Sequence, residues 1–124
     1  KKIRVSDKDT ITASLIATGI PYDDFGRAEK FLSLLSHLMR DSKGIRRIGS
    51  AAMDLAYVAA GRFDSFFEYG LNPWDVAAGA LIVKEAGGKV SEFNGENDYV
   101  FGEDILASNS LTHQLMMDVI KKYF

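Results

Sequence analysis

The sequence feature that most constrains the fold of this 124-residue chain is the segment 72–88, Asn-Pro-Trp-Asp-Val-Ala-Ala-Gly-Ala-Leu-Ile-Val-Lys-Glu-Ala-Gly-Gly. Proline disfavours helical angles in the residue before it, so Pro73 separates the segment from the chain that precedes it. We expect a helix over residues 75–86 that ends at the glycine pair. Because residues 76–83 are apolar on every helical face, the pattern predicts a helix buried on all sides.

Small residues fill the middle of this predicted helix, from Ala77 to Ala80. Among them, Gly79 costs the helix roughly 1 kcal/mol relative to alanine. A glycine at such a position indicates that another part of the chain approaches the helix closely. The segment therefore predicts a helix that packs tightly against a neighbour.

The carboxylate of Asp75, at the start of this helix, has two possible roles. As an N-cap it would accept hydrogen bonds from the first amides of the helix. Directed into a pocket, it would bind a hard cation such as Mg²⁺ through oxygen. The position of Asp75 in the sequence does not decide between the two roles.

Composition excludes several classes of protein. The chain is 47% hydrophobic and 26% charged, which is typical of a globular domain, and its length predicts a single domain over residues 1–124. A net charge of −2 gives no basic surface for nucleic acid. Without cysteine there is no disulfide or thiolate metal site, and no apolar run reaches the length of a membrane span. We expect a cytoplasmic protein without nucleic-acid or membrane partners.

Strand and helix patterns alternate along the chain. This alternation predicts an α/β sandwich in which helices flank a mixed sheet. The expected strands are residues 12–18, 45–47, 62–68, 89–93 and 105–108, with 1–6 as a further extended segment; the expected helices are 28–40, 51–60, 75–86 and 111–122. Residues 22–26 and 94–97 are expected to be loops.

Apolar residues at helical spacing predict which helix faces pack on the core. These stripes are Phe31, Leu34, Leu35 and Leu38 in the first helix, Ile48, Ala52, Leu55 and Ala59 around the second, and Leu111, Leu115, Val119 and Lys122 in the last. His37 lies beside the first stripe without another ligand at metal-binding spacing, so we interpret it as a boundary residue.

Two further positions carry alternative interpretations. The turn Gly49-Ser50-Ala51 has two interpretations. Ser50 can simply cap the helix that follows, or the helix start can offer free amides to an anion such as a phosphate ester. Glu68 ends the strand 62–68 and can be solvated or accept hydrogen bonds from a polyol.

Four segments together resemble one protein family. Residues 74–88 are similar to the C-terminal signature of the inositol monophosphatase family: Trp-Asp, small residues, an aliphatic run, then Glu-Ala-Gly-Gly. The resemblance extends to Arg-Arg-Ile-Gly-Ser-Ala-Ala at 46–52, Gly-Arg-Phe-Asp-Ser-Phe-Phe-Glu at 61–68 and Ala-Thr-Gly-Ile-Pro at 17–21. It covers nearly the whole chain, which resembles the C-terminal half of the family's fold.

The resemblance implies roles for particular residues. Asp75 would be a Mg²⁺ ligand, Glu68 would contact substrate hydroxyls, and Gly49, Ser50 and Ala51 would lie beside the substrate. The N-terminal half, with its Glu and its Asp-Pro-x-Asp-Gly-Thr segment, is not matched in this sequence. The resemblance therefore implies that this chain alone lacks a complete active site and is inactive without its missing half.

The function implied by this resemblance is Mg²⁺-dependent hydrolysis of a small phosphate ester, inositol monophosphate or a related sugar phosphate. One alternative is a relative that acts on fructose 1,6-bisphosphate or a nucleotide 3′-phosphate. Another is a non-catalytic half-domain that self-associates as a homo-oligomer through an uncovered apolar face or open sheet edges.

Overall fold

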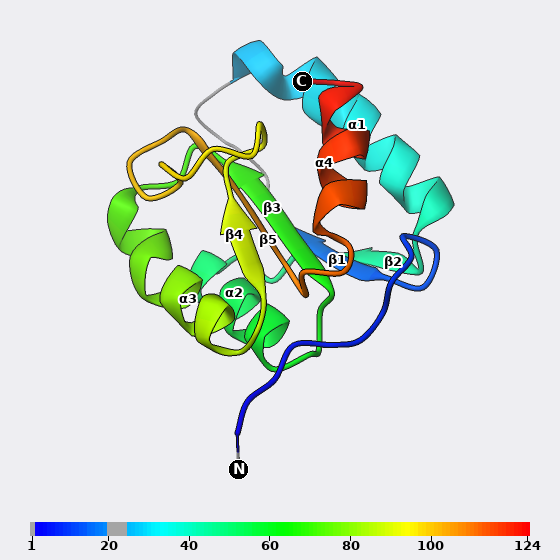
Figure 1. The fold of residues 1–124 in the computed structure, drawn as a ribbon. Coiled ribbons are helices and arrows are strands. Elements are labelled where there is room, and N and C mark those ends of the chain that lie inside the picture. The colour runs from blue at the N-terminus through cyan, green and yellow to red at the C-terminus, as the bar shows by residue number, and fades with distance from the viewer. Residues whose placement is uncertain (1, 20–24) are drawn as a thin grey trace.

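The computed structural model describes residues 2–19 and 25–124 (Figure 1). The strands of this part are β1 (Leu15–Thr18), β2 (Gly44–Arg46), β3 (Ser65–Tyr69), β4 (Lys89–Ser91) and β5 (Asp104–Ser108). Its helices are α1 (Ala28–Asp41), preceded by the 3₁₀ turn Phe25–Arg27, then α2 (Ala51–Ala59), α3 (Pro73–Glu85) and α4 (His113–Lys121).

The strands of the described residues form one mixed sheet in the order β2-β1-β3-β5-β4. The strands β2, β1 and β3 are parallel, while β5 is antiparallel to both β3 and β4. From β1 the chain passes through α1 to β2 on one side, then returns through α2 to β3 on the other side of β1. The direction of winding therefore reverses between β1 and β3.

Each face of the sheet has its own apolar core (Figure 1). The helices α2 and α3 cover one face, where Phe66 packs with Leu55 and Val83. The helices α1 and α4 cover the other face, where Phe67 packs in the second core. The adjacent residues Phe66 and Phe67 serve different cores because successive side chains of a strand point to opposite faces. This arrangement confirms the predicted α/β class with helices flanking a mixed sheet.

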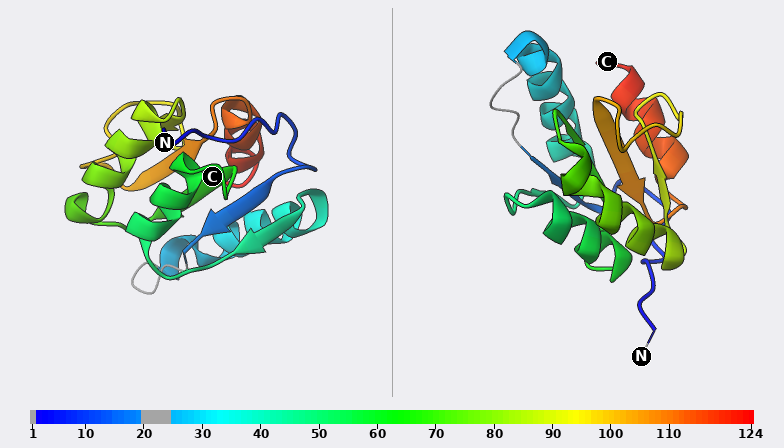
Figure 2. Two further views of the ribbon diagram at one scale, coloured as in Figure 1. Left: turned by 90° about the horizontal axis from the view of Figure 1, so that it is seen from below. Right: turned by 90° about the vertical axis from the view of Figure 1, so that its left-hand side faces the viewer.

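The helix positions agree with the sequence pattern, and the strands β1, β3 and β4 are shorter than predicted. The predicted strand at 62–68 begins only at Ser65. The expected extended segment at 1–6 is not a strand over its described residues. It runs past the edge of the sheet where β3 begins and β5 ends (Figure 2). It is held there by a hydrogen bond from the Val5 N–H to the carbonyl of Ala86 and by one from Asn109 Nδ2 to Ser6 Oγ. In the predicted loop 22–26, residues 22–24 lie outside the described residues.

The predicted core stripe of α2 is confirmed at Leu55 and Ala59 and wrong at Ile48, and the predicted stripe of α4 is wrong at Leu111 and Leu115. In α2 the buried residues are Asp54, Leu55, Val58 and Ala59, whereas Ile48 is 37% exposed. In α4 the buried residues are His113, Met116, Met117 and Ile120, whereas Leu111 and Leu115 are exposed. The reason in α4 is polar: both ring nitrogens of His113 hydrogen-bond to hydroxyls of the sheet, those of Ser91 at 2.8 Å and Ser108 at 2.7 Å.

The close approach predicted at Gly79 is confirmed. A Cβ built there would lie 2.6 Å from Leu55 Cδ1, so α2 and α3 pack too closely for any side chain at this position. The predicted stop is also confirmed: Gly87 adopts φ +95° and the Gly88 N–H donates to the carbonyl of Val83, as at glycine-ended helices.

The prediction that α3 is buried on all sides is wrong. Its outer face is open: Leu81 is 56% exposed, Ile82 42% and Trp74 77%. Met53 of the neighbouring α2 is 45% exposed as well. Only one layer, the sheet with α2, packs against α3 in the described chain. An apolar face of this kind on a helix pair marks an interaction surface.

No helix among the described residues is long and apolar enough to cross a membrane.

The open face predicts self-association of the isolated chain. We expect sedimentation velocity to show mass that rises with concentration, and Leu81→Lys to restore the monomer because it places a charge in the apolar contact. The matched control is Leu32→Lys in α1, an equally exposed leucine on the other face of the sheet. A wild-type chain that stays monomeric at all concentrations would contradict this prediction.

Candidate functional site

A cavity of about 430 Å³ lies where the winding of the sheet reverses, outside the carboxyl ends of β1 and β3. In open α/β sheets this switch point is the usual place for a ligand. The cavity is lined by Gly19, Arg47, Gly49, Ser50, Ala51, Ala52, Glu68, Leu71, Trp74 and Asp75. Glu68 lies near the end of β3, the other residues come after β1, β2 or β3, and they meet only through the topology of the sheet.

All five predicted site residues therefore lie in one cavity: Gly49, Ser50, Ala51, Glu68 and Asp75. Their roles stay predictions. Of the segment 17–21 that contributed to the resemblance, Gly19 lines the cavity, and residues 20 and 21 lie outside the described residues.

Glu68 packs directly over the end of β1. A Cβ at Gly19 would clash with the Glu68 carboxylate, so any larger residue there would require this side chain to move. The pKa of Glu68 is raised to about 7, mainly by burial and also by the negative charges of Asp54 and Asp75, while Arg47 acts in the opposite direction. The carboxyl is therefore poised between its neutral and charged forms near neutral pH, and a cation in the cavity would favour the charged form.

The start of α2 forms a second wall of the cavity. Ser50 is the N-cap, and its Oγ accepts a hydrogen bond of 3.3 Å from the Met53 N–H. This confirms the capping interpretation. Gly49 adopts φ +91°, a conformation that favours glycine and brings the chain into the helix at this point. A single cap satisfies only one of the free N–H groups at a helix start. The N-terminus of α2 therefore keeps its partial positive charge beside the cavity.

Asp75 is not the N-cap of α3, as one interpretation held. Asn72 is the N-cap, Pro73 occupies the first helical position, and Asp75 is the third residue of the helix. Its Oδ2 accepts a hydrogen bond of 3.0 Å from the Asn72 N–H, which is half of a capping box. A carboxylate has two oxygens, so this bond fixes the side chain and leaves acceptor capacity for a cation.

The described residues supply only part of a metal site. Across residues 2–19 and 25–124, no three His, Cys, Asp or Glu side chains are grouped to hold a metal ion. Mg²⁺ is commonly held by one or two carboxylates together with waters and substrate oxygens. The arrangement thus fits one carboxylate ligand, Asp75, and needs others.

Asp54 is a site neighbour that sequence reasoning missed. It is 1% exposed, its Oδ1 has no hydrogen-bond partner among the described residues, and burial raises its pKa to about 6. Its charge acts on Glu68. The available signal was an acid between apolar residues of the helix 51–60, at a position where an outward-facing charge is normally expected.

Sequence comparison places this fold and cavity in a known class. Residues 1–123 match the inositol monophosphatase family. The chain belongs to that family, as the resemblance predicted.

Several relatives are similar over nearly the whole chain. Nus factor SuhB of Pseudomonas aeruginosa is 40% identical over 125 residues, 99% of this chain and 46% of that protein. Inositol-1-monophosphatase of Mesorhizobium japonicum is 40% identical over 122 residues, 98% of this chain and 46% of that protein.

Solved structures agree with these relatives. The extragenic suppressor protein suhB of Bartonella henselae superposes with a TM-score of 0.92 at 42% identity, over 98% of this chain and 47% of that one. Inositol monophosphatase of Anabaena gives 0.88 at 38% identity, over 98% and 48%. The chain thus spans about half the length of the relatives it matches, in keeping with the resemblance to one half of the family's fold.

The buried acid gives a test of the site's electrostatics. The folded pKa of Asp54, about 6, lies above its ordinary 3.8. Ionisation of Asp54 therefore does not lower the free energy of unfolding below pH 3.8, and it lowers it fully above pH 6. We expect Asp54→Asn to raise the free energy of unfolding at pH 8 by about 1–2 kcal/mol, and this gain to vanish near pH 4. Urea unfolding at both pH values measures it.

The matched control is Asp9→Asn, because Asp9 is an exposed acid in the N-terminal segment. It should change stability by less than about 0.5 kcal/mol at either pH. A loss of stability in Asp54→Asn at pH 8 would mean that the Asp54 carboxylate is stabilised by a partner.

Proposed function

We propose that this chain is one half of a Mg²⁺-dependent phosphomonoesterase that hydrolyses inositol monophosphate or a related sugar phosphate. The observation that carries the proposal is the cavity at the switch point, which gathers a helix start and two separate carboxylates. Membership of the inositol monophosphatase family supports the same chemistry.

Different walls of the cavity would bind different parts of a phosphate ester. The start of α2, at Ser50 and Ala51, offers amides and a partial positive charge to the phosphoryl oxygens. Arg47 adds a cationic side chain to the same wall. Glu68, in its charged form, accepts hydrogen bonds from substrate hydroxyls, which favours a polyol over an apolar alcohol.

Asp75 would hold a Mg²⁺ ion against this cavity. The bound ion would neutralise charge on the phosphate ester and lower the pKa of an attacking water. The hydrogen bond from the Asn72 N–H keeps the carboxylate in place for this purpose. Since the described residues contain no complete ligand cluster, the other ligands are proposed to come from outside this chain.

The open face of α2 and α3 is where the rest of the enzyme would pack. Trp74 and Ala52 are exposed on these helices and also line the cavity, so the apolar face continues into the site. A further layer of chain placed there would bring new side chains to the cavity edge. The matched relatives have a length sufficient for such a layer, because this chain spans less than half of them.

A second candidate function comes from the names of relatives. Proteins 40–43% identical to this chain are called Nus factor SuhB, in Pseudomonas aeruginosa and Escherichia coli among others. A Nus factor role of this kind would not depend on the Asp75 carboxylate, so a variant of that residue separates it from hydrolysis.

The proposal is tested by phosphate release from inositol 1-phosphate and fructose 1,6-bisphosphate, with and without Mg²⁺. We expect the isolated chain to be inactive. A chimera in which this chain follows the first half of the Mesorhizobium japonicum enzyme should be active, with the monophosphate preferred. Asp75→Asn in the chimera should lower kcat/KM roughly 100-fold or more, since it removes a direct metal ligand.

The matched control is Asp118→Asn, an exposed acid of α4 remote from the cavity, which should retain full activity. Turnover by the isolated chain in Mg²⁺ would refute the half-site interpretation. A folded chimera that releases no phosphate, or an Asp75→Asn chimera with full activity, would refute the proposed function.

A further inference from the structure

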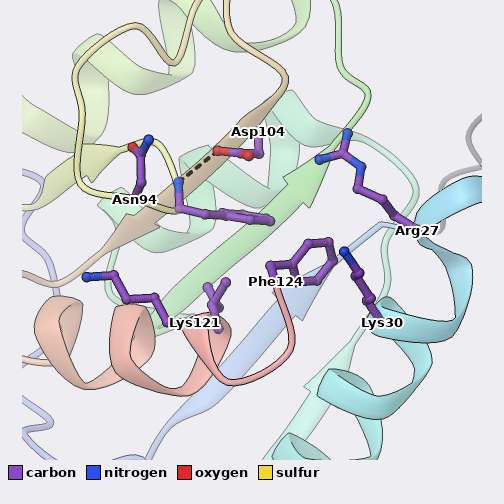
Figure 3. A pocket seen from close by; sticks show the side chains of 8 residues that line it. Arg27, Lys30, Asn94, Asp104, Lys121 and Phe124 are labelled. Carbon is purple, nitrogen blue, oxygen red and sulfur yellow. Dashed lines mark hydrogen bonds between the residues drawn. The ribbon is translucent and has the colours of Figure 1, made fainter.

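A second cavity, of about 280 Å³, lies between α1 and α4, in the layer on the opposite face of the sheet from α2 and α3 (Figure 3). We call it the α1–α4 cavity. It is lined by Arg27, Lys30, Phe93, Asn94, Asp104, Ile120, Lys121 and Phe124. It shares no residue with the candidate site.

One wall of the α1–α4 cavity is apolar and largely aromatic. Phe93 is 5% exposed and Ile120 is fully buried, so both belong to the core. The ring of Phe124 packs edge-on against Phe93 with centroids 5.4 Å apart, and against Tyr69 at 5.7 Å. Aromatic contacts of this kind fix the rings, which gives the cavity a rigid surface for a flat ligand.

The rim of the cavity is cationic. Arg27 directly precedes α1, Lys30 lies in its first turn, and Lys121 comes from the last turn of α4 (Figure 3). A cation in the last turn of a helix is favourable, but Arg27 and Lys30 oppose the dipole of α1 at its positive end. Helix stability therefore accounts for Lys121 and not for the pair at the start of α1.

The position of Arg27 is fixed by its surroundings. Its guanidinium lies 4.3 Å from the ring centroid of Tyr69, a cation–π contact, and Nη2 lies 3.5 Å from Glu103 Oε2. The Glu103 side chain is 84% exposed, so this ion pair is weak and screened by solvent. A planar fork held on an aromatic ring is suited to a phosphate or carboxylate.

Of the acids near the cavity, Asp104 lines it, while Glu92 and Glu103 lie close enough for their charges to act on Asp104. Asp104 Oδ1 accepts a hydrogen bond of 2.7 Å from the Phe93 N–H (Figure 3). Burial is the main cause that raises its pKa. No ion pair of Lys30 or Lys121 forms with another residue of 2–19 or 25–124. Three cations thus face one lining carboxylate that is engaged with the main chain.

We propose that the α1–α4 cavity binds a small organic anion, with its phosphate or carboxylate group on Arg27 and Lys30 and its flat apolar body against Phe93 and Phe124. Lys121 adds positive potential from the opposite side. The volume suits a single ring with one charged group, at the small end of ligand pockets. This binding does not rest on the proposed hydrolysis, because the two cavities have no residue in common.

The probe is phenylphosphonate, a non-hydrolysable anion with one ring, titrated into the chain and followed by amide ¹H–¹⁵N NMR. We expect saturable shifts at Phe93, Asn94 and the first turn of α1. Inorganic phosphate, which lacks the ring, and benzyl alcohol, which lacks the charge, should each bind roughly tenfold more weakly or worse. The indole signal of Trp74, in the other cavity, should not follow the same curve.

Charge-reversal variants locate the site. Lys30→Glu should weaken phenylphosphonate binding by roughly tenfold or more, and Lys121→Glu by roughly threefold. The matched control is Lys122→Glu, the next residue after α4, which is exposed and does not line the cavity. It carries the same change in net charge and should leave binding unchanged.

Lys30→Glu places a negative charge in the first turn of α1, which the helix dipole favours, so this variant should fold. If Lys30→Glu and Lys122→Glu weakened phenylphosphonate binding equally, the effect would come from net charge alone, and the proposed site would be refuted. So would shifts scattered over the surface, or tighter binding of inorganic phosphate than of phenylphosphonate.

Discussion

The contact between Gly79 of α3 and Leu55 of α2 is the constraint on which the candidate site depends. Both helices follow parallel strands, so both begin at the same edge of the sheet. Close packing at Gly79 keeps them side by side along their length. As a result the start of α2 and the carboxylate of Asp75, more than twenty residues apart in sequence, face one cavity. A larger residue at 79 would separate these two walls.

The electrostatics of the cavity are those of an incomplete site. Burial is the main cause that raises the pKa of Glu68 to about 7, and the negative charges of Asp54 and Asp75 contribute to the rise. Burying a carboxylate beside like charges is costly in a folded protein unless a cation or further donors relieve it. The unpartnered oxygen of Asp54 and the open apolar face of α3 have the same explanation. Both would be completed by a further layer of protein and by a bound metal ion.

The two faces of the sheet differ in chemistry. The α2–α3 face carries acids and an apolar helix pair, and the cavity there adjoins the strand ends. The α1–α4 face is closed by core packing and carries a cationic rim above aromatic rings. One chain thereby presents an acidic cavity, for which we propose a metal ion and a phosphate ester, and on the opposite face a cavity with a cationic rim, for which we propose an organic anion. The sheet between them lets each be changed without the other.

The sequence alone indicated the helices, their stops and five of the residues that line the candidate cavity. The helix limits follow from local rules, since Ser50 caps a helix and Gly87 takes a positive φ, whereas Glu68 and Asp75 were singled out by the family resemblance. The sequence also predicted the buried face of α1, at Phe31, Leu34 and Leu38, but the tertiary structure decided which faces of α2, α3 and α4 are buried. Three features depend on which layers pack on each helix: the burial of His113 in α4, the open face of α3 and the burial of Asp54. Local sequence does not encode the number of those layers. The cavity between α1 and α4 likewise exists only because distant segments meet.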